Sequence, residues 1–222
     1  MELPEFDALF LNEEQEIHRE QKVPEKERAL AILALLISAS ASKALSQKLP
    51  EFIASGALSR LQTAEVFYQA IPYLGYGKAK EMSLVLCDYL AAENLHMVAT
   101  EPLNEEERLS QGSAAQVAIF GEGMKDFYKG SDVNRYLALN CFGDFYTRRG
   151  LDLPQRELVT FCFLYGLGGC EPQVLAHIHG NLHCGNDLAF LRGIVKEGIP
   201  YIGYPRSLNA LTALATVEKE GH

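Results

Sequence analysis

The chain has 222 residues, of which 48% are hydrophobic and 22% are charged, a balance typical of a globular protein with a substantial core. Its formal net charge of -9 argues against a nucleic acid partner, because a phosphate backbone attracts basic surfaces. Five cysteines without the spacing of a disulfide framework indicate a reducing compartment. We expect a cytoplasmic protein without a membrane partner, because no apolar run is long enough to cross a bilayer and the acidic N-terminus lacks a signal-peptide core.

The first strongly apolar segment, residues 29–37, follows Arg28 and is apolar on nearly every side. Such a segment predicts a helix that is buried all round. Helices are also expected over residues 58–70 and 187–197, which are amphipathic, begin after a glycine and can be capped by Ser59 and by Asn186 or Asp187. Since no segment alternates with a period of two, the chain is predicted to be almost wholly helical.

A polar stretch, residues 101–111, separates two more apolar parts of the chain. Thr100 or Asn104 can cap the helix that follows it. We therefore predict two units, one at residues 1–100 and one at residues 101–222.

Two parts of the chain resemble each other at a long spacing. An arginine before an apolar run, and an Ile-Pro-Tyr followed by Gly-Tyr, recur at one constant offset in residue number; the matching pairs are Arg28 and Arg156, Ile71 and Ile199, and Gly75 and Gly203. Such self-similarity is typical of a repeated structural unit. Because both copies keep the Pro-Tyr-x-Gly-Tyr segment, Tyr201 and Tyr204 are interpreted as packing residues.

The second unit contains a helix with chemically useful side chains. Pro172 suits the first turn of a helix, and a helix from there to about Gly185 places four residues in one stripe: Cys170, Gln173, His177 and Cys184. A thiol at a helix N-terminus, with an imidazole two turns along the same stripe, can move protons or electrons. The structural alternative is that both are packed core residues, as lone cysteines and interior histidines commonly are.

Other polar residues nearby have two interpretations each. Arg156 could hold a substrate carboxylate through paired hydrogen bonds, or it could pair with Glu157 or another acid near the start of its helix. His179 and His183 are four residues apart and could share a helix face, but a single acid lies at ligand spacing. Solvent-exposed histidines are therefore favoured over a metal site.

Three segments of the second unit carry a family resemblance: residues 149–160, 169–177 and 200–205. Together they resemble the carboxymuconolactone decarboxylase family, whose all-helical fold is shared with the alkylhydroperoxidase D proteins. The resemblance covers residues 135–215, and more weakly residues 24–90 as a second copy. It implies an all-α, alkylhydroperoxidase D-like fold of two tandem helical units, a small-molecule substrate, no cofactor and no metal. By analogy with duplicated members, it also implies a homotrimer.

The first activity that the resemblance implies is that of a cofactor-free lyase acting on a small carboxylated lactone or related acid. His177 is then the general acid/base, Cys170 and Glu157 are the proton-relay partners, and Gln173 hydrogen-bonds to the substrate. Members of this type usually carry a glutamate where Gln173 stands. Decarboxylation itself needs a conjugated carbonyl that accepts electrons, and a group that supplies a proton.

Two alternatives remain open. The alkylhydroperoxidase D type carries a second cysteine where this chain has Gln173. Cys184 follows Cys170 by about 14 residues, which is about 20 Å along a straight helix and beyond disulfide reach. The first alternative is therefore a single-cysteine thiol peroxidase that uses Cys170 and an external thiol. The second is a non-catalytic oligomeric binding or scaffold protein.

Overall fold

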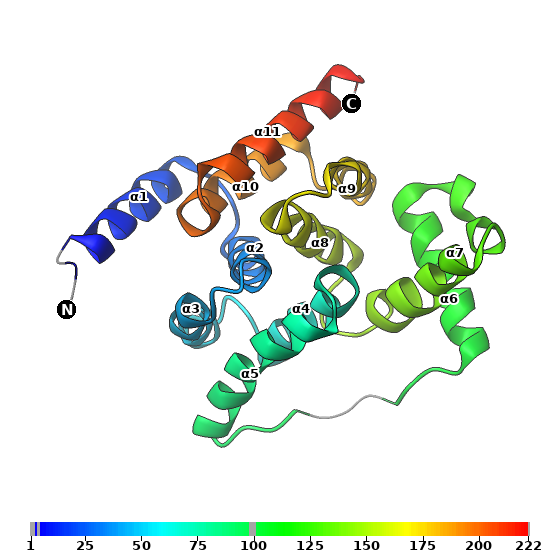
Figure 1. Cartoon of the computed structure of the whole chain (residues 1–222), viewed down its shortest axis with the longest axis horizontal. Coiled ribbons are helices and arrows are strands. Elements are labelled where there is room, and N and C mark those ends of the chain that lie inside the picture. The colour runs from blue at the N-terminus through cyan, green and yellow to red at the C-terminus, as the bar shows by residue number, and fades with distance from the viewer. Residues whose placement is uncertain (1–2, 4, 98–100, 222) are drawn as a thin grey trace.

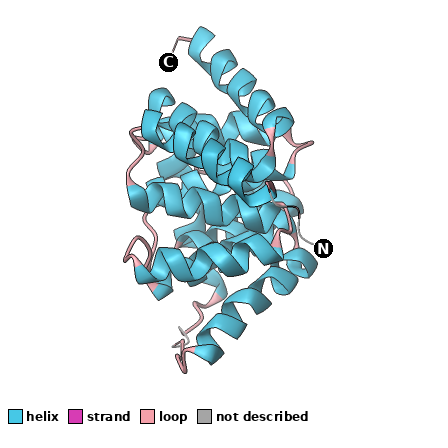
Figure 2. Cartoon of the chain, turned by 90° about the vertical axis from the view of Figure 1, so that its left-hand side faces the viewer, coloured by secondary structure: helices cyan, strands magenta, loops and turns pink. Residues whose placement is uncertain are grey.

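The structure is a computed structural model that describes residues 3, 5–97 and 101–221, and all regular secondary structure in those residues is helical (Figures 1 and 2). The prediction of an all-α chain, as in the alkylhydroperoxidase D-like fold, is confirmed. Within the same residues, no helix combines the length and the apolar composition needed to cross a bilayer.

Along the sequence, the helices fall into a first set, a middle layer, which lies at one side of the molecule (Figure 1), and a last set. The first set comprises α1 (Phe6–Glu20), α2 (Glu25–Ser38), α3 (Ser42–Ala54), α4 (Arg60–Leu74) and α5 (Tyr76–Ala92). The middle layer comprises α6 (Glu105–Phe120), two short 3-10 turns (Glu122–Met124 and Phe127–Lys129), α7 (Asp132–Tyr136) and a π-helix (Leu137–Tyr146). The last set comprises α8 (Leu153–Leu167), α9 (Glu171–His183), α10 (Leu188–Ile202) and α11 (Tyr204–Lys219).

Helices α2 and α8 lie side by side at the centre of the molecule (Figure 1). Most side chains of both helices are buried, including those of Arg28 and Arg156, so the predicted buried helix after Arg28 is confirmed. The two helices approach closely at Gly166, where an added Cβ would lie 2.1 Å from Ser38 Oγ. This crossing tolerates only a glycine on the α8 side.

The helix bounds recur at the spacing of the sequence repeat. Helices α4 and α10 end at Leu74 and Ile202, directly before the matching glycines Gly75 and Gly203. Helices α3 and α9 begin at Ser42 and Glu171, a spacing longer by a single position. The ends of α2 and α8, Ser38 and Leu167, already show this longer spacing, and the starts of α4 and α10, Arg60 and Leu188, return to the first one. The division of the chain into units at residues 1–100 and 101–222 stays a prediction.

Contacts between the two sets are reciprocal. Arg28 Nε on α2 donates to Glu197 Oε2 on α10 at 2.8 Å, and Arg156 Nη1 on α8 donates to Gln69 Oε1 on α4 at 2.8 Å. Since Arg28 matches Arg156 and Gln69 matches Glu197 at the offset of the repeat, each pair is the counterpart of the other. Such reciprocity is what a local two-fold axis produces.

The expected helix starts are present. Ser59 and Asn104 each form a capping box with the residue three positions on, and the side chain of Asp187 accepts from the Phe190 amide. Thr100, the other expected cap, lies outside the described residues. These caps fix where α4, α6 and α10 begin.

The middle layer covers one face of the last set. Helix α6 packs along the π-helix and also contacts α9, while the π-helix contacts α4, and Figure 1 shows α6 and α7 together on one side of the molecule. Helices of the π type are rare and occur frequently at functional sites. This layer brings side chains from outside the sequence repeat to the predicted site.

Candidate functional site

The centre of the site is a buried pair formed by one side chain from α8 and one from α9. His177 Nδ1 lies 2.8 Å from Glu157 Oε2, and the two side chains are 10% and 0% exposed. A carboxylate oxygen can only accept, so Nδ1 carries the proton and donates it to Glu157. The other ring nitrogen, Nε2, is then left to take up or release a proton, as a general acid/base must.

The local sequence explains why these two side chains meet. Helix α8 begins with a capping box between Asp152 and Gln155, which sets the register of Glu157. Gly168 and Gly169 adopt positive φ angles of 74° and 73°, which end α8 and turn the chain back into α9.

Helix α9 approaches the carboxylate closely because it carries glycine there. A Cβ at Gly180 would lie 2.4 Å from Glu157 Oε2. The next residue, Asn181, completes the support, because its side-chain amide donates to the backbone carbonyls of Glu157 and His177 at 3.0 and 2.7 Å. The backbone of both site helices is therefore tied together at the pair.

A chain of hydroxyl groups leads to the second oxygen of the Glu157 carboxylate. Tyr146 of the π-helix donates to Glu157 Oε1 at 2.8 Å. Because Tyr146 has a single hydrogen to give, the hydroxyls of Tyr73 and Thr160, each 2.8 Å from Tyr146 Oη, are the donors in those two contacts. Gln69 in turn donates to Thr160 Oγ1 at 2.8 Å. Both oxygens of Glu157 are therefore satisfied in an ordered chain of hydrogen bonds.

The surroundings of the pair are aromatic. The rings of Tyr73 and Phe120 meet the imidazole of His177 edge-on, with centroids 5.7 and 5.4 Å away. Burial raises the pKa of both Tyr73 and Tyr146 well above the ordinary tyrosine value, and the charge of Glu157 raises each of them further. These hydroxyls therefore stay protonated and serve as hydrogen-bond donors.

Two cysteines border the same network. Cys141 of the π-helix donates to Tyr73 Oη at 3.6 Å, and Cys184 packs against the apolar cluster that includes Cys141 and Tyr146. Burial, and then the charge of Glu157, raise the pKa of Cys184 to about 11. Burial raises the pKa of Cys141 to about 12. Both are neutral thiols near neutral pH, which is a poor state for a nucleophile.

The predicted role of Arg156 in binding a substrate carboxylate needs correction. Its side chain is fully buried, and its guanidinium donates to Glu65 at 3.0 Å, to Gln69 at 2.8 Å and to the backbone carbonyl of Arg148 at 2.8 Å. These partners take up the hydrogen bonds of the Arg156 guanidinium between α8 and α4, so it does not bind a substrate carboxylate. Arg156 is part of the contact between the two helix sets.

Cys170 lies apart from the pair, although it shares a helix face with His177. It precedes the first residue of α9, and its thiol donates to the backbone carbonyl of Leu164 at 3.2 Å. It lines a small cavity together with Arg206 and Asn209. Burial, and then the charge of Glu171, raise its pKa. The structure therefore does not bring Cys170 into the hydrogen-bond network of Glu157 and His177.

The remaining sequence candidates on α9 are more exposed than His177. Gln173 is exposed, one turn before His177. His179 Nε2 lies 3.3 Å from a carboxylate oxygen of Glu220, and His183 is exposed. Among the described residues, no group of three or more His, Cys, Asp and Glu side chains gathers as a metal site would require.

The sequence patterns did not single out Tyr73, Tyr146, Thr160 and Asn181. Tyr73 stands in the first copy of the repeated Pro-Tyr segment, whose counterpart Tyr201 is interpreted above as a packing residue. Asn181 follows His177 by one helical turn, so helical spacing gave a signal for it. Tyr146 comes from outside the repeat, and its role follows only from the tertiary structure.

Comparisons with known proteins agree with the resemblance at a distance. No family model matches the chain. Among curated proteins, the 4-carboxymuconolactone decarboxylase of Acinetobacter baylyi is similar to it, with 25% identity over 126 residues, which is 53% of this chain and 92% of the relative. The alignment thus covers nearly the whole relative and about half of this chain. This distant similarity supports a likeness to the carboxymuconolactone decarboxylase family at the level of the family alone.

Proposed function

We propose that the chain is a cofactor-free lyase of the carboxymuconolactone decarboxylase family, acting on a small carboxylated lactone or a related acid. The observation that carries the proposal is the buried pair of Glu157 and His177, 2.8 Å apart. A buried carboxylate that fixes the tautomer and orientation of an imidazole is the usual way to prepare a general acid/base. The distant similarity to a 4-carboxymuconolactone decarboxylase supports the same chemistry.

The proposed reaction follows from the protonation of this pair. The carbon–carbon bond to the substrate carboxylate breaks, carbon dioxide leaves, and the electron pair moves into a conjugated carbonyl. His177, protonated on both nitrogens, gives its Nε2 proton to the resulting carbanion, while Glu157 stabilises the imidazolium. Water then returns the proton to His177. Gln173, exposed one turn before His177 on the same face of α9, hydrogen-bonds to the substrate.

The thiol peroxidase alternative receives no support from the geometry. A peroxidatic cysteine needs a thiolate, which a nearby positive charge or a free helix N-terminus stabilises. The Cys170 thiol instead donates to a backbone carbonyl, and its pKa is raised. We therefore keep decarboxylation as the proposed activity.

The test uses the protein with 4-carboxymuconolactone and measures the release of carbon dioxide. The change His177→Gln removes the titrating nitrogen, so we expect kcat to fall by about 10²- to 10⁴-fold. His179→Gln is the matched control, because it makes the same change at a more exposed histidine of α9 and should leave kcat unchanged. Cys170→Ser should also retain activity.

Two results would overturn the proposal. One is turnover by the folded His177→Gln variant at the rate of the unchanged protein. The other is no release of carbon dioxide from this or related carboxylated lactones at any protein concentration, which would favour the non-catalytic scaffold.

We also propose a cytoplasmic homotrimer. All five cysteines are free, which suits a reducing compartment. Helices α1 and α7 expose large apolar side chains, with Phe6, Leu9 and Val133 at 65%, 66% and 72% exposure, and such surfaces favour association. Light scattering should give three times the chain mass of 24.6 kDa, and a single-chain mass would contradict the trimer.

A further inference from the structure

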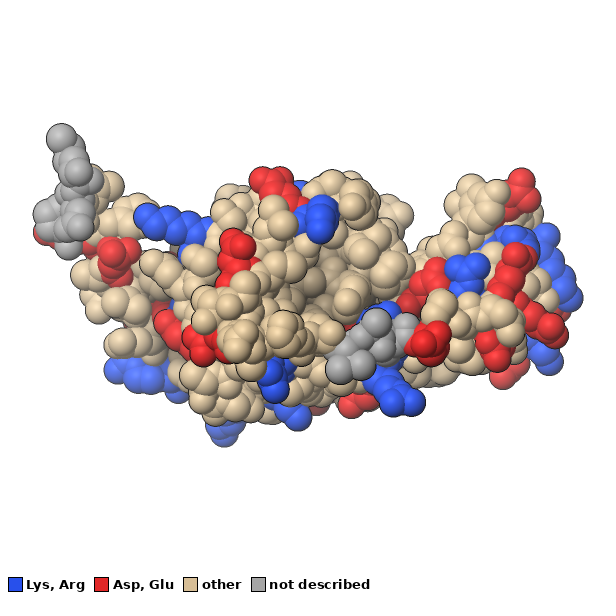
Figure 3. Space-filling view, turned by 90° about the horizontal axis from the view of Figure 1, so that it is seen from below, with Lys and Arg blue, Asp and Glu red and all other residues tan. Residues whose placement is uncertain are grey.

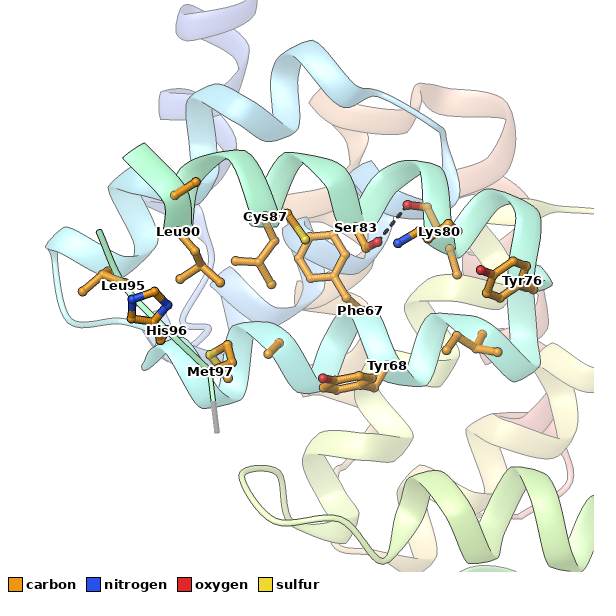
Figure 4. A pocket seen from close by; sticks show the side chains of 15 residues that line it. Phe67, Tyr68, Tyr76, Lys80, Ser83, Cys87, Leu90, Leu95, His96 and Met97 are labelled. Atoms are coloured by element: carbon orange, nitrogen blue, oxygen red, sulfur yellow. Dashed lines mark hydrogen bonds between the residues drawn. The ribbon is translucent and has the colours of Figure 1, made fainter. Parts of the chain in front are cut away.

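A cavity of about 570 Å³ lies between α4 and α5 (Figure 4), and the described residues that line it do not include His177. Its floor is made of buried apolar side chains, among them Phe67, Leu86 and Leu90. The view from below shows a hollow in the middle of the molecule that is bordered mainly by uncharged side chains (Figure 3). This volume lies in the usual range of small-molecule sites, roughly 300 to 1,000 Å³.

The lining selects against positive charge and in favour of a negative one. Although the chain carries 29 acidic residues, none of the described residues that line the cavity is acidic. Lys80 contributes an ammonium group, and it forms no ion pair with another described residue. An apolar wall beside a lysine without a carboxylate partner suits an anionic group on an apolar ligand.

The two ends of the cavity differ. Toward the start of α5 lies Lys80, whereas the guanidinium of Arg148, which stacks over the Tyr68 ring at 4.1 Å, is already paired with Glu65. At the other end lie the apolar side chains of Leu90 and Leu95, with the imidazole of His96 beside them (Figure 4). Lys80 and Leu90 are ten residues apart on one helix, which is about 15 Å along its axis. The cavity is therefore an elongated trough with the ammonium group of Lys80 near one end and mainly apolar side chains toward the other.

The second half of the chain differs at the matching positions. At the offset of the repeat, the counterparts of Lys80 and Ser83 are Leu208 and Leu211 of α11. The polar groups at this end of the trough thus belong to the first half alone. Packing of the repeated helices does not require them, because the equivalent pair of α10 and α11 is built with leucines.

We propose that this trough binds a monocarboxylate with an unbranched, medium-length hydrocarbon chain. The carboxylate lies at Lys80, and the chain extends along α5 toward Leu90. Binding here is independent of the proposed lyase activity, because Phe67 and Tyr68 of α4 line the trough while Tyr73 of the same helix faces His177.

Decanoate is the probe for the first measurement, which uses the full chain. Cys87 lines the trough and is exposed, while Cys170 lies in a different cavity. Bound decanoate should slow the alkylation of Cys87 at least fivefold, as measured by mass spectrometry, and should leave the alkylation of Cys170 unaffected. Equal labelling of Cys87 with and without saturating decanoate would overturn the proposal.

Calorimetry with chosen ligands and variants tests each part of the assignment. Decanoate should bind about tenfold more tightly than octanoate, because each methylene group contributes roughly a factor of three to four on burial. Lys80→Gln should weaken decanoate binding about two- to fivefold, the effect of an exposed charge pair, and leave decanol binding unchanged. An equal loss for decanol would overturn the role of Lys80.

A filling variant locates the site. Ser83→Leu introduces the residue that the second half carries at the matching position, so the fold should accept it, and we expect at least a tenfold loss of decanoate affinity. Unchanged affinity in the folded variant would overturn the site. The proposal would also be overturned if the unchanged protein failed to bind decanoate and the Ser83→Leu variant had a different oligomeric mass, since a second copy would then fill the trough.

Discussion

The two halves of the molecule place different chemistry at equivalent positions. In the second half, His177 of α9 meets the buried carboxylate of Glu157. In the first half, Lys48 of α3 is the counterpart of His177 and contacts Glu14 of α1 at 3.0 Å. The counterpart of Glu157 is Ala29, which has no charge to offer. A similar framework of helices therefore holds an imidazole pair on one side and an ion cluster on the other.

The charge balance separates the two sites. The first-half cluster is centred on Glu14 of α1, which pairs with Arg28 and Lys48 and accepts from Tyr201 of α10. Glu197 of α10 pairs with Arg28 and His18, and the more exposed Glu25 and Glu51 pair with Arg28 and Lys48 at the edge of the cluster. These charges neutralise one another and hold α1 against α2, α3 and α10. In the second half, the carboxylate meets an imidazole and hydroxyl groups, so one ring nitrogen is left for chemistry. Because its charges neutralise one another, the first-half cluster is structural. The pair of Glu157 and His177 has no such neutralisation, which makes it a candidate active site.

The largest expected effect on activity comes from Glu157→Gln. A glutamine carries no negative charge, so it no longer stabilises the His177 imidazolium that gives its Nε2 proton to the carbanion. We expect kcat on 4-carboxymuconolactone to fall by about 10²- to 10⁴-fold while the fold is kept. Glu14→Gln, the parallel change in the first-half cluster, should leave kcat unchanged. Equal kcat values for the two variants would remove the distinction between the halves.

The largest expected effect on stability comes from Arg156→Met. Arg156 is fully buried between α8 and α4, and its loss leaves Glu65 with Arg148 alone and Gln69 without its donor. Removing one member of a buried ion pair costs about 3–5 kcal/mol, which urea unfolding would detect. Its counterpart Arg28→Met should cost less, because the carboxylates that it leaves keep other partners. A larger loss for Arg28→Met would contradict this order.

Most of the fold follows from local signals in the sequence. The uninterrupted apolar run after Arg28 predicted the buried α2, and the caps Ser59, Asn104 and Asp187 marked three helix starts. Helix α1 was not predicted, because its buried residue is the charged Glu14 while large apolar side chains such as Phe6 and Leu9 are exposed. Periodicity assigns apolar residues to the buried face, so it could not show that this helix is attached through a buried carboxylate.

The candidate site was predictable in part. Helical spacing identified His177, and the family resemblance pointed to Glu157. Spacing also placed Cys170 in the same stripe, yet two turns of helix separate the two by about 10 Å, and the Cys170 thiol turns to the end of α8. Tyr146 could not be predicted, because the π-helix that carries it lies outside the repeat and its register is set by packing.

A smaller effect is expected from Tyr146→Phe, which removes the hydroxyl that donates to Glu157. Tyr146 is a positioning residue, so we expect kcat to fall about tenfold with KM unchanged, as is typical for partners of a site residue. Tyr201→Phe is the matched control, since it removes a hydroxyl that donates to Glu14 in the other half. It should leave both constants unchanged. A change in KM alone for Tyr146→Phe would indicate contact with the substrate instead.

The smallest expected effect concerns the pH dependence of the first-half cluster. Burial acts to raise the pKa of Glu14, but hydrogen bonds from Tyr201 and Lys48 and the charges of Lys48 and Arg28 hold it below its ordinary value of 4.5. A carboxyl group with a lowered pKa in the folded state stabilises the fold above its ordinary pKa, and this contribution is lost as the pH falls through the lowered value. Glu14→Gln should therefore cost about 1–3 kcal/mol near pH 7.

The pH dependence distinguishes this cluster from an ordinary surface pair. As the pH is lowered from 5 through the lowered pKa, the difference in unfolding free energy between Glu14→Gln and the unchanged protein should shrink, because protonation removes the charge of Glu14 in the latter. Glu51→Gln, which removes the exposed carboxylate on the other side of Lys48, should cost less than about 1 kcal/mol. A gap for Glu14→Gln that stays constant between pH 7 and pH 3 would mean that α1 is held by packing, and the two halves would then differ less in their chemistry than their charges suggest.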